Sequence, residues 1–110
     1  MSPTPTREME AMDILTIGRG PSVVAAGIEL IRAQGFTAHG VTVDADALAA
    51  LEDGPVGLLL IGGGVESDSS AALKEKAAQH GVPVIEAVRN GRDLETYLQE
   101  EVFPVLRARQ

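Results

Sequence analysis

Apolar residues alternate, from residue 13 onward, between short runs and longer segments of helical spacing. The short runs are rich in β-branched or apolar residues, and the first three end at glycine or aspartate, which predicts strands over residues 14–17, 37–43, 58–61 and 82–85. Helical spacing predicts helices over residues 23–31, 45–52, 69–80 and 93–109. Residues 1–12 lack this periodicity, so we expect a flexible leader followed by a single domain over residues 13–110.

Strands that alternate with helices predict a parallel sheet joined by right-handed crossovers. The fully apolar run at residues 58–61 is typical of a central strand covered on both faces. We therefore predict an α/β fold, a three-layer α-β-α sandwich with a four-stranded parallel sheet in strand order 2-1-3-4. Over residues 13–109 the chain resembles a small flavodoxin-like or Rossmann-like domain, a likeness of architecture that carries no function by itself.

Composition excludes several classes of function. The 110 residues include 9 Lys+Arg and 16 Asp+Glu, a net charge of −7 that argues against a nucleic-acid partner. The absence of cysteine excludes disulfides, thiolate nucleophiles and zinc–cysteine sites. No apolar run approaches the ~20 residues needed to cross a bilayer, and the first residues do not form a signal peptide, so we expect a cytoplasmic protein without a membrane partner.

Two glycine-rich loops follow the first and third predicted strands. Ligands of open parallel sheets bind at these strand ends, beside the switch in strand order. Free N–H groups at the start of a helix favour an anion, Pro21 suits the first helical position, and Arg19 would add positive charge. We predict a site for a small anionic or nucleotide ligand, formed by Gly18, Arg19, Gly20, Ser22, Asp44, Gly62, Gly63 and Gly64. Alternatively, these glycines only make tight turns.

The nature of the cofactor stays unknown, because known nucleotide motifs are met only in part. Gly18 and Gly20 match the start of the dinucleotide fingerprint, but Val23 stands at its third small position. Asp44 ends the second strand, where an acid that binds ribose would stand. Neither glycine loop continues into the Gly-Lys-Ser/Thr of a P-loop.

Acidic residues at or after the strand ends offer a second chemistry. Such carboxylates could hold Mg²⁺, or they could cap helices, as we expect for Asp44 and Asp68; we predict no metal site. The residues are Asp44, Asp46, Glu66, Asp68 and Glu86. Response-regulator receiver domains share the architecture, but they carry acids after strand 1 and a phosphorylated aspartate after strand 3, where this chain has glycines.

No arrangement typical of catalysis is present in the sequence. His39 falls in the second strand and His80 at the end of the third helix, so we expect both to have structural roles. Neither a Gly-x-Ser-x-Gly elbow nor a His-Glu-x-x-His pair occurs. We predict no catalytic residue.

The last predicted helix carries Phe103 and Pro104 beyond its apolar stripe. Proline inside a helix costs about 3 kcal/mol unless the helix kinks or restarts there. The segment 102–106 is therefore a candidate homodimer contact, or else it only covers the sheet.

Three functions remain open at this point. The first is a non-catalytic binding or regulatory module with its ligand at the glycine loops. The second is a nucleotide- or metal-dependent enzyme that uses Asp44 or Glu66 in the same crevice. The third is a structural module that binds a partner through the last helix.

Overall fold

A computed structural model describes residues 12–53, 55–87 and 91–109 of the chain. All strand pairs are parallel and the sheet order is β2-β1-β3-β4, which confirms the predicted fold class and strand order. The strands are β1 (Ile14–Ile17), β2 (Ala38–Val41), β3 (Leu59–Ile61) and β4 (Val84–Glu86). The helical segments are α2 (Pro21–Ala33), α3 (Asp44–Asp53), α4 (Ser67–Gln79), α5 (Leu94–Tyr97), the π-helical η1 (Leu98–Val102) and α6 (Phe103–Arg109).

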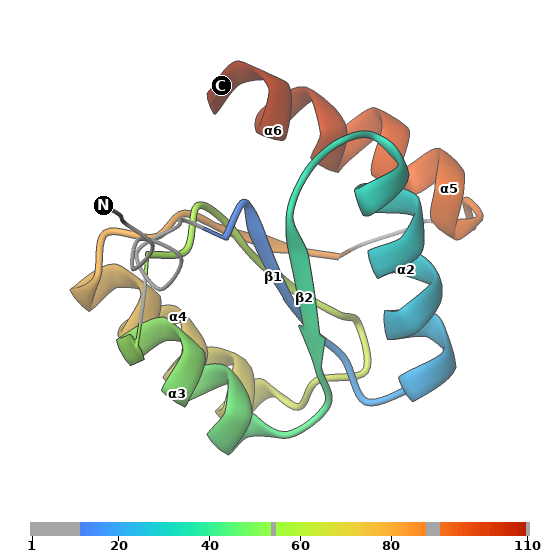
Figure 1. The fold of residues 1–110 in the computed structure, drawn as a ribbon. Helices are drawn as coiled ribbons and strands as arrows, with labels where there is room; N and C mark the ends of the chain where they lie inside the picture. Colours follow the sequence, from blue (N-terminus) through green and yellow to red (C-terminus); the bar gives the residue numbers. More distant parts are fainter. Residues whose placement is uncertain (1–11, 54, 88–90, 110) are drawn as a thin grey trace, which may run out of the picture.

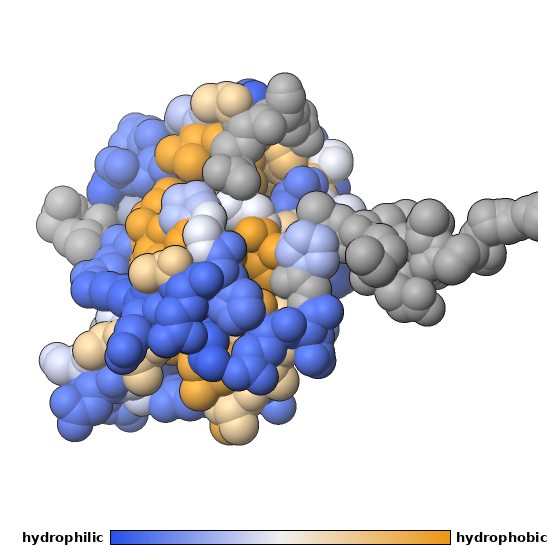
Figure 2. All heavy atoms as spheres, turned by 90° about the vertical axis from the view of Figure 1, so that its left-hand side faces the viewer, coloured by the Kyte–Doolittle hydropathy of each residue, from blue (hydrophilic) through white to orange (hydrophobic). Residues whose placement is uncertain are grey.

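The sheet lies between two helical layers (Figure 1). Helices α3 and α4 cover one face, and α2 covers the other together with α5, η1 and α6. Side chains of a strand point alternately to the two faces, so Leu15 and Ile17 enter the core beneath α3 and α4, whereas Ile14 enters the core beneath α2. The outer side of the α3–α4 layer is mostly hydrophilic, with small hydrophobic patches (Figure 2).

Helix α2 packs closely on the edge strand β2. A Cβ atom on Gly40 would lie 2.5 Å from Val24 Cγ1 and 3.0 Å from Ile28 Cγ1, so only glycine fits at this position of β2. At the other end of the strand, the guanidinium of Arg32 donates to the Ala38 carbonyl, with distances of 3.2 and 2.8 Å. This contact occupies part of the strand edge, where backbone groups are otherwise open to another chain.

The C-terminal helix differs from the single predicted helix over residues 93–109. Asp93 caps its start by accepting from the Thr96 N–H at 3.0 Å. One π turn separates α5 from α6, and in it the Phe103 N–H donates to the carbonyl of Leu98, five residues earlier. Because Pro104 has no N–H to donate, the regular hydrogen-bond series is interrupted beside this turn.

Phe103, the residue expected at a homodimer contact, lies inside the chain. Its side chain is 2% exposed, and its ring stacks on Phe36 with the ring centres 6.4 Å apart. On this part of the helix Val105 is an exposed large apolar side chain. Self-association stays a prediction, and a contact through this helix would have to use its outer side.

The start of the described chain is already tied to the sheet. Met12, which the sequence assigned to the leader, pairs with Val56, and its N–H donates to the Pro55 carbonyl at 3.0 Å. Residues 1–11 of the predicted leader lie outside the described residues. Among the described helices, none is long and apolar enough to cross a membrane.

We predict that Gly40→Ala lowers the free energy of unfolding by about 1–3 kcal/mol, because the added methyl group must displace buried Val24 or the backbone of β2. Chemical denaturation measures the change. Gly64→Ala is the matched control, since a Cβ there would meet nothing closer than 3.8 Å and should change stability little. Equal effects of the two substitutions would contradict the close packing of α2 on β2.

Candidate functional site

The loops after β1 and β3 meet at the carboxyl edge of the sheet. The Gly62 N–H donates to the Ile17 carbonyl at 2.7 Å, and the Gly18 N–H donates to the Val41 carbonyl at 3.2 Å. A Cβ on Gly62 would lie 3.1 Å from the Ile17 oxygen, so a side chain here would be crowded against the backbone of β1. The two glycine loops therefore form one continuous rim at the switch in strand order, where ligands of open parallel sheets bind.

Arg19 joins this rim to the start of both helices on the α3–α4 side. Its guanidinium contacts Asp44 Oδ1 at 2.6 Å and Glu66 Oε1 at 2.7 Å, and it also donates to the Thr42 carbonyl at 2.8 Å. Ser69 closes the group, because its hydroxyl donates to Asp44 Oδ2 at 2.5 Å. We call Arg19, Asp44, Glu66 and Ser69 the arginine cluster.

The positive charge of Arg19 is balanced within the arginine cluster. The hydrogen bond from Ser69 and the guanidinium of Arg19 lower the pKa of Asp44 below its ordinary 3.8, and Arg19 likewise lowers the pKa of Glu66 below 4.5. With both carboxylates ionised, one positive charge faces two negative ones. Arg19 therefore offers little attraction to a strongly anionic ligand.

A cavity of about 340 Å³ opens on the opposite side of the same rim, between the sheet and helices α2 and α5. This volume lies near the lower end of the range for small-molecule sites. Most of its wall is apolar. The lining residues are Thr16, Gly18, Arg19, Gly20, Val23, Val24, Gly27, Ile31, Leu60, Gly62, Gly63, Gly64, Ala87, Leu94, Tyr97 and Leu98.

Thr16 is the unusual residue of this wall. It stands in the middle of the sheet on β1, is 8% exposed, and its hydroxyl has no hydrogen-bond partner among the described residues. Leaving a buried polar group unsatisfied costs about 1–3 kcal/mol. Thr16 thus combines a place in the cavity wall with a polar group that has no partner among the described residues.

Gly27 forms the opposing part of the wall, in the interior of α2. Glycine in a helix interior is less favourable than alanine by about 1 kcal/mol. Packing does not require it, because a Cβ would meet Leu94 Cδ2 at an ordinary 3.8 Å. The missing side chain instead keeps space open between α2 and α5.

The structure brings together part of the predicted site. Gly18, Arg19, Gly20, Gly62, Gly63 and Gly64 all line the cavity. Ser22 is exposed on α2 and does not line it, and Asp44 lies in the arginine cluster. The start of α2 borders the cavity at Gly20 and has no side-chain cap, so its first N–H groups lack an intrahelical acceptor.

Sequence reasoning missed Thr16, Gly27 and Tyr97. Thr16 interrupts the apolar pattern of its strand, and Gly27 interrupts a helix, so both carried a signal that could have been followed. Tyr97 is 2% exposed, and the guanidinium of Arg92 lies 5.3 Å from its ring centre. Nothing in the sequence indicated that Tyr97 would line the same cavity as the glycine loops.

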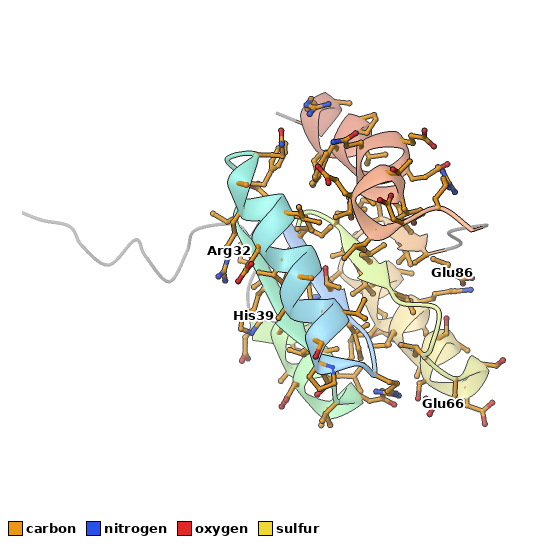
Figure 3. All side chains as sticks on the ribbon, turned by 90° about the vertical axis from the view of Figure 1, so that its right-hand side faces the viewer. Arg32, His39, Glu66 and Glu86 are labelled. Atoms are coloured by element: carbon orange, nitrogen blue, oxygen red, sulfur yellow. The ribbon has the colours of Figure 1, made fainter. Side chains whose placement is uncertain are left out.

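The other acidic residues and histidines considered in the sequence do not come together in one site. Glu86 forms an ion pair with Lys74, and Asp68 lies within the first turn of α4, which begins after Glu66 and has no side-chain cap. His39 is exposed at the β2 edge, away from Glu66 at the carboxyl end of the sheet (Figure 3). No set of three His, Asp or Glu side chains in the described ranges is arranged to hold a metal ion.

The lowered pKa values predict how the arginine cluster responds to pH. Arg19→Met should reduce the free energy of unfolding at pH 7, where both carboxylates are ionised. Wild type should lose this advantage as the pH falls below 4.5 and through the lowered pKa values of Glu66 and Asp44, so the two proteins should converge once the pH lies below both lowered values.

Chemical denaturation at a series of pH values measures this difference. Arg32→Met is the control, because Arg32 donates to a backbone carbonyl that does not titrate. A difference between wild type and Arg19→Met that stays constant with pH would contradict the contribution of Asp44 and Glu66.

Two solved structures share the architecture of the chain. One is a de novo designed Rossmann 2x2 fold protein solved by NMR in solution, with a TM-score of 0.58 and 15% identity over 84% of this chain and 86% of that chain. The other is a de novo designed Rossmann fold protein, with a TM-score of 0.53 and 17% identity over 84% of this chain and 96% of that chain. No family model and no curated protein matches the chain. At such identities the likeness concerns the fold alone, and the chain has a small Rossmann-like α/β fold.

Proposed function

We propose that the protein is a non-catalytic binding or regulatory module whose small-molecule ligand occupies the cavity between the carboxyl ends of β1 and β3 and helices α2 and α5. The observation that carries this proposal is the hydroxyl of Thr16, a residue of the cavity wall that is buried in the central sheet and has no hydrogen-bond partner within the described part of the chain. A ligand would supply the hydrogen bond that the chain leaves open.

Two residues that weaken the fold line this one cavity. Valine in place of Thr16 would remove the unsatisfied hydroxyl, and alanine in place of Gly27 would favour the helix and fit the space. Residues that lower the stability of their own strand or helix are typical of functional sites. Their presence at facing positions of one cavity supports a binding role.

We do not favour an enzyme that uses Asp44 or Glu66. Both carboxylates bind Arg19, and both pKa values are lowered, which opposes the uptake of a proton from a substrate near pH 7. A partner-binding module built on Phe103 is also disfavoured, because that side chain is buried against Phe36.

The first test concerns the Thr16 hydroxyl in ligand-free protein, obtained by unfolding and refolding. Thr16→Val should raise the free energy of unfolding by about 1–3 kcal/mol, because the unsatisfied group is removed. Thr37→Val is the control with the opposite sign, since the Thr37 hydroxyl accepts from the Asp13 N–H at 2.8 Å. If Thr16→Val destabilised the protein as Thr37→Val does, the hydroxyl would have a partner and the proposal would lose its basis.

The second test fills the cavity from α2. Gly27→Leu places a side chain between α2 and α5, whereas Ala26→Leu adds a comparable side chain at an exposed position of the same helix. Native mass spectrometry after incubation with the small-molecule fraction of a cell extract should show an added mass on wild type and on Ala26→Leu, but not on Gly27→Leu. An equal added mass on all three proteins, or none on wild type, would contradict the proposed site.

The same spectra test the predicted homodimer.

A further inference from the structure

We infer that the ligand of this cavity is an uncharged, largely apolar molecule with one hydrogen-bonding group, and that phosphorylated ligands are excluded. This inference rests on the proposed function, because it names the chemical class that the same cavity takes. It departs from the anionic or nucleotide ligand that the glycine loops alone predict.

The wall of the cavity carries the first argument. Helix α2 contributes Val24 and Ile31, β3 contributes Leu60, and the C-terminal helix contributes Leu94 and Leu98. Such side chains remove apolar ligand surface from water and give nothing to an ionic group. The body of the ligand is therefore apolar.

The charges near the cavity carry the second argument. Arg19 is the one charged side chain among the described lining residues, and its guanidinium is held by Asp44, Glu66 and the Thr42 carbonyl. A phosphate or carboxylate in the cavity would lose its water without gaining a free cation, and the first N–H groups of α2 beside Gly20 would replace only part of that water. The net charge of −7 adds repulsion of anions over the whole molecule.

The Thr16 hydroxyl carries the third argument. It carries one donor and its lone pairs in a residue of a mostly apolar wall. A carbonyl, hydroxyl or amide on the ligand can satisfy it without burying a charge. The glycines at 62–64 let this end of the ligand come close to the backbone.

The experiment compares four probes on the full ¹⁵N-labelled chain by the shifts of its backbone amide signals. Acetophenone has an apolar ring and one neutral acceptor, ethylbenzene lacks the acceptor, benzoate carries a charge, and adenosine monophosphate carries a phosphate. Acetophenone should shift the amides around Thr16, Gly27 and Gly63, and it should bind about fivefold more tightly than ethylbenzene, as expected for one neutral hydrogen bond. Benzoate should bind at least about tenfold more weakly than acetophenone, and the nucleotide should not shift these amides.

Two variants of Thr16 separate the hydroxyl from the space around it. Thr16→Val should bind both neutral probes equally, whereas Thr16→Ser should keep the preference for acetophenone. The inference would be overturned if the preference for acetophenone survived in Thr16→Val or were absent in wild type. It would also be overturned if benzoate or the nucleotide bound more tightly than acetophenone at these amides. In each of these cases the cavity would still bind ligands, so the proposed function would stand. If no probe shifted the cavity amides, both proposals would fail.

Discussion

The connections that leave β1 and β3 run to opposite faces of the sheet, and this divergence determines which groups lie on each side of its carboxyl edge. Helix α2 turns to one face and α4 to the other, so the two loops separate after their close contact at Gly62. Arg19 lies at the point of separation and extends toward α3 and α4. Because the charge of Arg19 is balanced on that side, the opposite side is left with a mostly apolar cavity whose wall includes the buried hydroxyl of Thr16.

The fold could be predicted because its signals are local. Short apolar runs ended by glycine, helical spacing between them, and the continuous run at residues 58–61 together require a parallel sheet with a covered central strand. The first and last residues of each element follow less directly from the sequence. Strand β4 begins at Val84, later than predicted. Pro83 stands at its border, because the Pro83 carbonyl accepts from the Leu59 N–H but proline has no N–H to donate to the sheet.

The site was predictable in position but not in chemistry. The glycine loops indicated the right edge of the sheet, whereas the partners of Arg19 lie 25 and 47 residues away in the sequence. No local pattern tells whether such an arginine meets a ligand or two carboxylates of its own chain. Thr16 poses the reverse problem, since threonine is common in strands and only the assembled layers reveal that its hydroxyl meets no partner in the ranges that the structure describes.

The π turn beside Pro104 makes the side-chain directions of α6 depend on the number of residues in that turn. Each residue of a helix turns the chain by about 100°, so the wider turn at Leu98–Val102 sets the direction in which every later side chain points. With this setting Phe103 faces Phe36 and Leu106 faces the core. Loss of one residue within the turn would rotate α6 as a unit and carry the aromatic ring away from its neighbour. Insertions and deletions there would thus act at a distance, through register rather than through the contacts of the residue gained or lost.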